Sequence, residues 1–282
     1  MNSLIDIETL LRAGDYIGAA SLYAKIDIDS HFSNLSDKVE HLLLISGLYL
    51  QGEDNTSSES YLASAVALAN TGSVPRGTQL QLYLAQATNL DKRARFSESS
   101  SMYLKLAEDA ELDQEKRIIV MQRASICALI SSGLVRDTLV SRIVGLAIFS
   151  FMHPALSMLV TKIKHGDVIE LDEMKAAESL CEPHHMALTA NNMPMFINHL
   201  LEYNIISCVG EVAISQVAER VGMSEECAED FLVSMIAKKR VRARVSHRKR
   251  IVVFEQVELE SGKKIQDFCE RVSRLADRLS LV

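Results

Sequence analysis

The sequence lacks tryptophan and has little of the two residues that interrupt helices, with four Pro and twelve Gly among 282 residues. Aromatic residues make up only 5% of the chain, whereas 48% of it is hydrophobic. Few helix breakers in a chain rich in Leu, Ala, Ser and Glu favour helix over strand. We therefore expect a mainly α protein that can bury one large core or two modest ones.

Paired cysteines and long apolar runs are also missing. The five cysteines stand apart, with no C-x-x-C pair and mostly apolar neighbours: Cys127, Cys181, Cys208, Cys227 and Cys269. We expect them to be buried free thiols in a reducing compartment. The longest apolar run, Ile143 to Met152, is too short to span a bilayer. The first residues also lack the pattern of an export signal, so we expect a protein that is not exported.

Known catalytic and nucleotide-binding signatures are absent as well. H-E-x-x-H, H-x-H, G-x-S-x-G and G-x-x-x-x-G-K-[ST] do not occur. The adjacent His184 and His185, with Glu182 beside them, are the one cluster with metal-ligand chemistry. Neighbouring histidines in an irregular segment after Pro183 rarely converge on one ion, and no Cys or Asp completes the set. We predict no catalytic residue, no metal site and no cofactor.

The first half of the chain contains three similar segments, which start at Ala13, Gly52 and Arg93 and so lie 39 (13 to 52) and 41 (52 to 93) residues apart. They are AGDYIGAASLYAKI, GEDNTSSESYLASA and RARFSESSSMYLKL. Each has a polar or turn-forming opening, then small residues, then an aromatic residue. The pattern is clearest in Tyr16, Ala19, Ala20 and Tyr23, and in Phe96, Ser99, Ser100 and Tyr103.

Small residues at these positions would let a second helix approach closely. A period of about 40 residues with two helices per unit is typical of a helical-repeat solenoid. We therefore predict a TPR-like region over residues 1–190, with a fourth unit placed near Gly133. The alternative is a chance likeness between stretches of helical sequence.

From Asn191 the pattern changes to three helices and a β-hairpin. NNMPMFINHLLEYN indicates a helix with Pro194 in its first turn, and ISQVAERVG indicates one that ends at Gly222. SEECAEDFLVSMIAKK predicts a third helix that begins after Ser224. Its predicted apolar side consists of Cys227, Phe231, Leu232 and Met235.

Two strands, Val241–Val245 and Ile251–Phe254, are expected to follow, joined by a turn at Ser246–Arg250. Three helices and a hairpin in this order predict a winged helix over residues 191–256.

The last segment, residues 257–282, spaces Ile265, Phe268, Val272, Leu275, Leu279 and Val282 as a heptad seam. Such a helix needs a partner, either its own chain or the terminal helices of other subunits.

The run KKRVRARVSHRKR, Lys238 to Arg250, holds eight Lys or Arg and one His in a chain of net charge −7. On a strand, period 2 sends Val241, Ala243 and Val245 to one face and Arg240, Arg242 and Arg244 to the other. The apolar face is predicted to be core. The arginine face suits an acidic protein partner, with nucleic-acid phosphate as the alternative. The third helix opens with carboxylates that repel phosphate, so base readout by this helix is not expected.

Helical repeats that lead into a winged helix and a terminal helix resemble the PCI family, the scaffold subunits of the proteasome lid, the COP-9 signalosome and translation initiation factor 3. The likeness is strongest to the signalosome, with the proteasome lid as the rival. It lies in GLYLQGEDNTSSESYLASAVAL (Gly47–Leu68), RASICALISSG (Arg123–Gly133), KIKHGDVIELDEM (Lys162–Met174), EPHHMALTANNMPMFINHLLEYNIIS (Glu182–Ser207) and KKIQDFCERVSRLADRL (Lys263–Leu279).

This resemblance implies a non-catalytic scaffold in a complex that removes a ubiquitin-like modifier from cullin-RING ubiquitin ligases. The implied partners are other PCI subunits and a JAMM-type metalloprotease subunit, which performs the chemistry. A membrane is not among the implied partners. In the family, hairpins pair edge to edge and terminal helices form a bundle. The matching wing-edge residues here are Arg240, Val241, Arg242, Arg244, Val245, Ile251 and Val253. The matching seam residues are Ile265, Phe268, Val272, Leu275 and Leu279.

Overall fold

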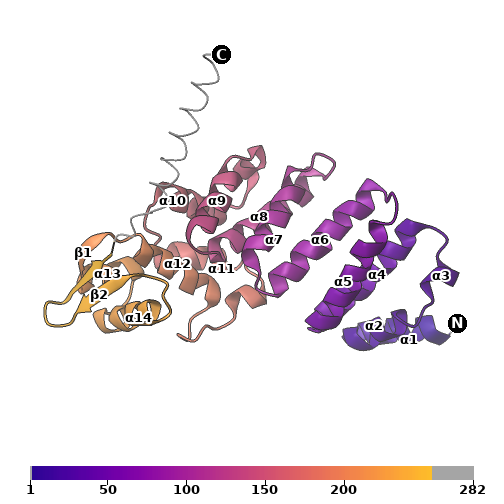
Figure 1. Ribbon diagram of the computed structural model, residues 1–282, viewed down its shortest axis with the longest axis horizontal. Coiled ribbons are helices and arrows are strands. Elements are labelled where there is room, and N and C mark those ends of the chain that lie inside the picture. Colours follow the sequence, from indigo (N-terminus) through magenta and orange to yellow (C-terminus); the bar gives the residue numbers. More distant parts are fainter. Residues whose placement is uncertain (1, 256–282) are drawn as a thin grey trace, which may run out of the picture. The chain divides into compact units, whose positions relative to one another are not determined.

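The structure, a computed structural model, describes residues 2–255 of the chain (Figure 1). By their internal contacts the residues fall into two compact units, the first ending at Leu200 and the second beginning at Leu201. The described residues form fourteen α-helices, two short 3-10 helices and one three-stranded antiparallel sheet. The predicted mainly α fold is thus confirmed. None of the described helices is both long and apolar enough to cross a membrane.

The first unit is built from helices that follow one another along the chain, and neighbouring helices pack as pairs (Figure 1). The closest pairs are α4 with α5, α6 with α7, and α7 with α8. The helices are α1 (Asn2–Arg12), α2 (Tyr16–Tyr23), α3 (Ile28–His31), α4 (Leu35–Gln51), α5 (Asn55–Ala69), α6 (Arg76–Lys92), α7 (Phe96–Glu108), α8 (Gln114–Ile130), α9 (Gly133–Val144), η1 (Ala147–Phe151), α10 (Pro154–His165), α11 (Leu171–Glu178) and η2 (Pro183–Met186).

The three sequence repeats share one backbone turn, which joins α1 to α2, α4 to α5 and α6 to α7. The turn residue adopts the left-handed conformation each time, with φ of 76° at Gly14, 63° at Glu53 and 58° at Ala94. The N–H of the next residue then bonds a carbonyl five positions back, at 2.9 Å each time: Asp15 to Leu10, Asp54 to Tyr49 and Arg95 to Leu90. This is the Schellman arrangement that satisfies the last carbonyls of a helix. Its recurrence at the predicted positions confirms the helical repeat.

The small residues of the repeats are packed as the sequence predicts. Ala19, Ala20, Ser99 and Ser100 are all fully buried. The Ser99 hydroxyl donates to the Ala87 carbonyl on α6 at 2.9 Å, and the Ser100 hydroxyl donates to the Ala124 carbonyl on α8 at 2.8 Å. A hydroxyl that reaches the backbone of the next helix requires a close approach of the two helices, which a larger side chain would prevent.

The remaining elements are α12 (Met195–Ile206), β1 (Gly210–Ala213), α13 (Ile214–Val221), α14 (Glu225–Ala237), β2 (Ala243–Ser246) and β3 (Ile251–Phe254). The strand order is β1-β3-β2, with both pairs antiparallel. Gly222 ends α13 in the left-handed conformation, and the Ser224 hydroxyl accepts from the Cys227 N–H at the start of α14. Both helix limits agree with the sequence patterns, as do the limits of β3.

Two local predictions were wrong, and one strand was missed. The first strand of the hairpin is Ala243–Ser246 rather than Val241–Val245, so Val241 precedes it. Strand β1 was not predicted, because its four residues, GEVA, show little strand pattern. On α14 the buried residues are Ala228, Phe231, Leu232 and Met235, whereas Cys227 is exposed.

Not all cysteines are buried as predicted. Within the described residues Cys127 and Cys208 are buried free thiols, Cys181 is half-buried and Cys227 is exposed. Burial, together with the nearby Glu178, raises the pKa of Cys181 to about 12, and burial also raises the pKa of Cys127 and Cys208. These three thiols are therefore held in the protonated form at neutral pH. Cys269 lies outside the described residues.

Candidate functional site

Among residues 2–255, no strand pairs with the outer edge of β2 in the sheet of the second unit. In the register, Arg244 lies opposite Val253, and Val245 lies opposite Val252. The Glu255 N–H donates to the Arg242 carbonyl at 2.9 Å. Ladder bonds fall on alternate residues of an antiparallel pair, so the backbone groups of Arg242 and Arg244 face β3. Those of Ala243 and Val245 point outward, where the described residues provide no further strand.

The predicted wing-edge residues divide into two groups. Arg244 and Val245 lie on the edge strand, and Arg240, Val241 and Arg242 lead into it. Ile251 and Val253 lie on β3, which is the central strand because β1 pairs with its other side. The backbone groups of Ile251 and Val253 pair with β2, so neither residue lies at the edge of the sheet, and their role as subunit contacts stays a prediction. Sequence reasoning missed β1 and hence the position of β3.

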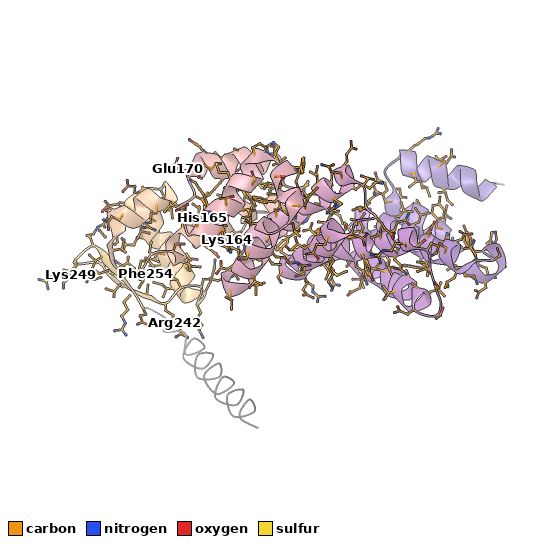
Figure 2. The ribbon with its side chains drawn as sticks, turned by 90° about the horizontal axis from the view of Figure 1, so that it is seen from above. Lys164, His165, Glu170, Arg242, Lys249 and Phe254 are labelled. Atoms are coloured by element: carbon orange, nitrogen blue, oxygen red, sulfur yellow. The ribbon has the colours of Figure 1, made fainter. Side chains whose placement is uncertain are left out.

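Side chains alternate between the two faces of the sheet, as the sequence predicts. Ala243 and Val245 share the face of Val252 and Phe254, which are buried. Ala243 and Val245 are themselves only partly buried, so the prediction that they belong to the core is met only in part. Arg244 shares the outer face with Val253, whose side chain is exposed. Figure 2 shows Arg242 and Lys249 projecting from the ribbon.

The basic run does not present a single block of free charge, because part of it is paired with carboxylates of its own chain. Arg250 forms ion pairs with Glu225 and Glu229, and His247 Nδ1 lies close to the Glu229 carboxylate. Arg244 Nε lies 3.0 Å from Glu255 Oε1. Five cations of the run form no ion pair with the described residues: Lys239, Arg240, Arg242, Arg248 and Lys249.

These pairs occupy the start of α14, the helix that a DNA-binding winged helix would place in a groove. Glu225 lies in its first turn and Glu229 follows one turn later. Both carboxylates bind Arg250 of the wing. One wing cation is thus used to neutralise acids on the same surface, whereas Arg248 and Lys249 in the turn form no ion pair with the described residues. The arrangement suits a protein partner with mixed charge better than a uniformly negative polymer.

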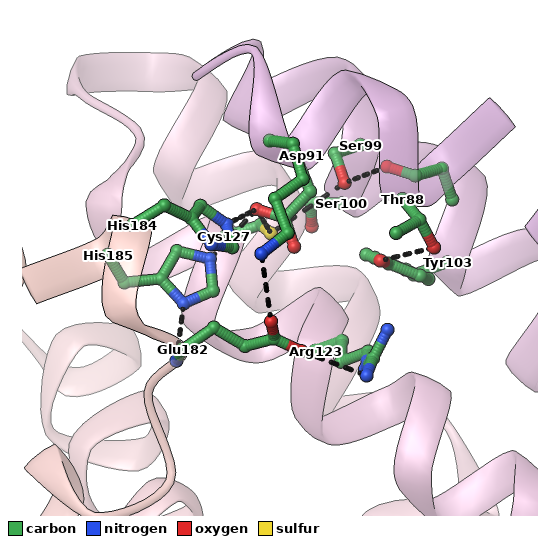
Figure 3. Close-up of polar contacts among 12 residues, drawn as sticks. Thr88, Asp91, Ser99, Ser100, Tyr103, Arg123, Cys127, Glu182, His184 and His185 are labelled. Carbon is green, nitrogen blue, oxygen red and sulfur yellow. Dashed lines mark hydrogen bonds and ion pairs between the residues drawn. The ribbon is translucent and has the colours of Figure 1, made fainter. Parts of the chain in front are cut away.

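A second polar cluster lies within the first unit, between the end of α6 and η2 (Figure 3). Asp91, which is only 3% exposed, accepts hydrogen bonds at Oδ1 from His184 Nε2 at 3.0 Å and from His185 Nε2 at 2.8 Å. The Cys127 thiol also lies 3.3 Å from this oxygen. The sequence analysis found no Asp to complete the histidine pair, and the fold supplies one. Asp91 is 94 residues from His185, so no local pattern could identify it.

The two histidines determine the ionisation of Asp91. Burial alone would raise the pKa of this carboxyl group, but the hydrogen bonds from His184 and His185 outweigh burial and hold the pKa well below its ordinary value. The carboxylate in turn acts on Tyr103: burial and the nearby Asp91 charge raise the pKa of Tyr103 to about 12. Asp91 is therefore a buried anion at neutral pH.

The ligand types Asp91, His184 and His185 suit a transition metal, and their candidate ligand atoms lie within 4.8 Å of one another. The position of one proton argues against such a site. His185 Nδ1 accepts a hydrogen bond from the Glu182 backbone N–H at 3.0 Å, so a neutral His185 carries its proton on Nε2. Nε2 is the atom that faces Asp91 and would have to bind the ion. A histidine that binds a metal with one ring nitrogen donates a hydrogen bond with the other, whereas Nδ1 of His185 accepts one.

Glu182 extends this cluster to the rim of a groove of about 1040 Å³. Its carboxylate lies 3.3 Å from Lys92 Nζ and 2.9 Å from an Arg123 guanidinium nitrogen. Helices α4, α5 and α6 supply most of the other lining residues, among them Leu50, Leu84 and Thr88. Together with the two histidines, Glu182 fastens the segment around η2 onto the helical repeats. We interpret this cluster as a structural latch, formed by Asp91, Glu182, His184 and His185.

The predicted seam residues Ile265, Phe268, Val272, Leu275 and Leu279 lie outside the described residues. Their role as a subunit contact stays a prediction.

Comparison with curated proteins gave no match to the chain. Comparison with family models gave one match, which covers the sheet, α12, α13 and α14 and leaves out the helical repeats. The three-helix and three-strand order of this segment agrees with the winged helix that the sequence predicts. Residues 190–256 of the chain match the PCI domain.

Proposed function

We propose that the protein is a non-catalytic scaffold subunit of a multi-subunit complex of the COP-9 signalosome type, corresponding to subunit 4. The match of residues 190–256 to the PCI domain is the observation that carries this proposal, because the PCI domain suggests a scaffold in a complex with other PCI subunits. The outer edge of β2, which no other described strand pairs with, supports it, since an unpaired strand edge is a template for another chain.

In this proposal another subunit, of the JAMM metalloprotease type, removes the ubiquitin-like modifier from cullin-RING ligases. The present chain contributes surfaces rather than chemistry, in the cytoplasm and the nucleus. Support comes from the described residues: the hydrogen-bonded His185 nitrogen makes the one candidate metal cluster a poor ligand set. The rival assignment is a PCI scaffold of the proteasome lid.

The test is purification of the tagged full chain from its own cells, followed by mass spectrometry of what co-purifies. We expect other PCI subunits together with a JAMM-type subunit and cullins. Proteasome-lid subunits in their place would move the assignment to the rival complex. A second arm deletes Lys263–Val282, which contains the predicted seam, and should eject the chain from the complex. Unchanged co-purification of that variant would contradict a role for the seam.

Nucleic-acid binding is the alternative that the basic run raised. The pairing of Arg250 with Glu225 and Glu229 does not favour it. Phosphate contacts are strong at about 50 mM salt. Retention on duplex DNA or RNA under that condition, weakened in Arg242→Ala and Arg244→Ala variants, would revive it.

A further inference from the structure

The groove beside the latch adjoins a second hollow, and the two lie along helices α4 and α6. Their volumes are about 1040 and 640 Å³, and Gln81 of α6 lines both. Pockets that hold ligands usually measure about 300–1,000 Å³. We call the two hollows together the α4–α6 groove, which extends from Asp37 and Glu40 on α4 to Glu53 in the turn after α4. All of its lining residues belong to the first unit.

The middle of the groove lacks a side chain at one position of α4. Gly47 lies inside this helix, and a Cβ added there would meet no described atom within 4 Å. Glycine inside a helix lowers its stability relative to alanine, and no neighbour among the described residues requires the missing side chain. Leu50, Leu84 and Ala85 line the groove as well, and Leu84 is 39% exposed. The centre of the groove is therefore open to an apolar side chain of a ligand.

Three carboxamide side chains in the groove are available to a ligand. Gln51, Asn55 and Gln81 line it, and their side chains form no hydrogen bond with the described residues. A carboxamide both donates and accepts, so it matches the N–H and C=O groups of an extended backbone, which has no internal hydrogen bonds. A helix bonds these groups internally. The carboxamides therefore favour an extended ligand over a helical one.

The charge left unpaired in the groove is negative. Asp37 and Glu40 lie at one end of the groove and Glu53 lies at the other, and none of the three forms an ion pair with the described residues. By contrast, both Lys and Arg side chains of the wall pair with the Glu182 carboxylate. A ligand with basic side chains is complementary to this distribution.

The spacing of the groove residues along α4 gives the spacing of the ligand side chains. Gly47 is 7 residues from Glu40 (40 to 47) and 6 residues from Glu53 (47 to 53). At the rise of a helix, each interval corresponds to about 10 Å. An extended chain covers about 10 Å in three residues. A ligand with an apolar side chain at Gly47 would thus bring the third residue on either side to a carboxylate.

We propose that the α4–α6 groove binds an extended basic segment of another protein, with an apolar side chain over Gly47 and a Lys or Arg three residues to either side. The basic side chains pair with the carboxylates at the two ends, and the carboxamides hold the backbone between them. This inference goes beyond the proposed scaffold function, because the groove lies in the helical repeats and outside the segment that matches the PCI domain.

The experiment measures the fluorescence anisotropy of labelled heptapeptides mixed with the full chain. The test peptide has Lys at both ends, Leu in the centre, one Pro to prevent a helix and Ser elsewhere. One comparison peptide replaces both Lys by Glu, and another replaces the central Leu by Ser. The test peptide should bind about tenfold more tightly than either one. Its advantage over the Glu peptide should decrease with salt, because exposed charges are screened.

One substitution blocks the centre of the groove without loss of packing. Gly47→Leu should weaken binding of the test peptide about tenfold. It should not lower stability in urea unfolding, because the added Cβ meets no described atom. The matched control is Ser64→Leu, at an exposed position of α5 outside the groove, which should leave binding unchanged.

Two double variants separate the charge of the groove from overall charge. Asp37→Asn with Glu40→Gln should reduce the preference for the test peptide over the Glu peptide about threefold. Asp137→Asn with Glu219→Gln removes two exposed carboxylates outside the groove and should keep the preference.

Equal or tighter binding of the Glu peptide overturns the proposal, and so does the absence of binding at about 1 mM test peptide, the range of very weak ligands. Unchanged binding to the Gly47→Leu chain would also refute it, because the peptide would then lie elsewhere. None of these measurements depends on other subunits. Failure of the groove is therefore distinguishable from failure of the scaffold function.

Discussion

Replacement of Asp91 by Asn tests whether the latch holds the first unit together. Asn keeps the size of the side chain and one acceptor oxygen but removes the charge. In the structure this oxygen receives hydrogen bonds from His184 Nε2 at 3.0 Å and His185 Nε2 at 2.8 Å, in a site that is 3% exposed. A hydrogen bond to a charged group contributes about 1.5–3 kcal/mol and a neutral one about 0.5–1.5 kcal/mol. Two bonds together should therefore lose about 2 kcal/mol.

The assay is urea unfolding of the full chain, followed by circular dichroism at neutral pH. Asp91→Asn should lower the free energy of unfolding by about 2 kcal/mol. Asp137→Asn on α9 is the matched control, because Asp137 is exposed and forms no ion pair among the described residues. It should change stability by less than about 0.5 kcal/mol. An Asp91→Asn chain as stable as the control would refute the role of the carboxylate.

The pH dependence provides a second check. The pKa of Asp91 is lower in the folded protein than its ordinary value of about 3.9 in the unfolded chain. Its contribution to stability is therefore complete above that pH and is lost as the pH falls through the folded-state pKa. The difference in stability between the native chain and Asp91→Asn should shrink below about pH 4. A difference that grows as the pH falls below about 4 would contradict the assigned sign.

Three further outcomes are expected. Ala94→Gly should stabilise the chain by about 0.5–1 kcal/mol in the urea-unfolding assay, because Ala94 has a φ of 58° that glycine adopts without strain. A loss of stability would mean that the turn is not strained. Ser100→Leu should cost about 2 kcal/mol or more, since Ser100 is fully buried against α8, whereas Lys105→Leu at an exposed position of α7 should not. Excess Zn²⁺ should leave the melting temperature unchanged, because His185 Nδ1 accepts a hydrogen bond from the Glu182 backbone N–H and the proton of a neutral His185 therefore occupies the nitrogen that faces Asp91. A rise in melting temperature that disappears in His184→Ala and His185→Ala would establish a metal site.

Most of the fold could be predicted because its determinants are local. The limits of α13 and α14 depend on Gly222 and Ser224, and the repeat depends on turns at Gly14, Glu53 and Ala94. Strand β1 could not be predicted, because its pairing with β3 is decided by residues about 40 positions later in the chain. The exposure of Cys227 was missed because a shift of one residue places Ala228 in the core instead.

The candidate sites were predicted unevenly for the same reason. Alternation along Arg240–Val245 placed the arginines on one face before the strand order was known. Whether a strand lies at the edge depends on its neighbours, so the central position of Ile251 and Val253 could not be predicted. The latch could not be found from local spacing, because Asp91 and His185 are brought together by the packing of the first unit.

The latch also bears on the order of folding. The repeats pair helices that are neighbours in the chain, so their contacts close short loops and can form early. The Asp91–His185 bond joins residues 94 positions apart, and the entropic cost of closing so long a loop is met only after the intervening helices have packed. We expect the segment around η2 to join the structure last and to open first. A protease or a chaperone would then bind this segment before any other part of the first unit unfolds.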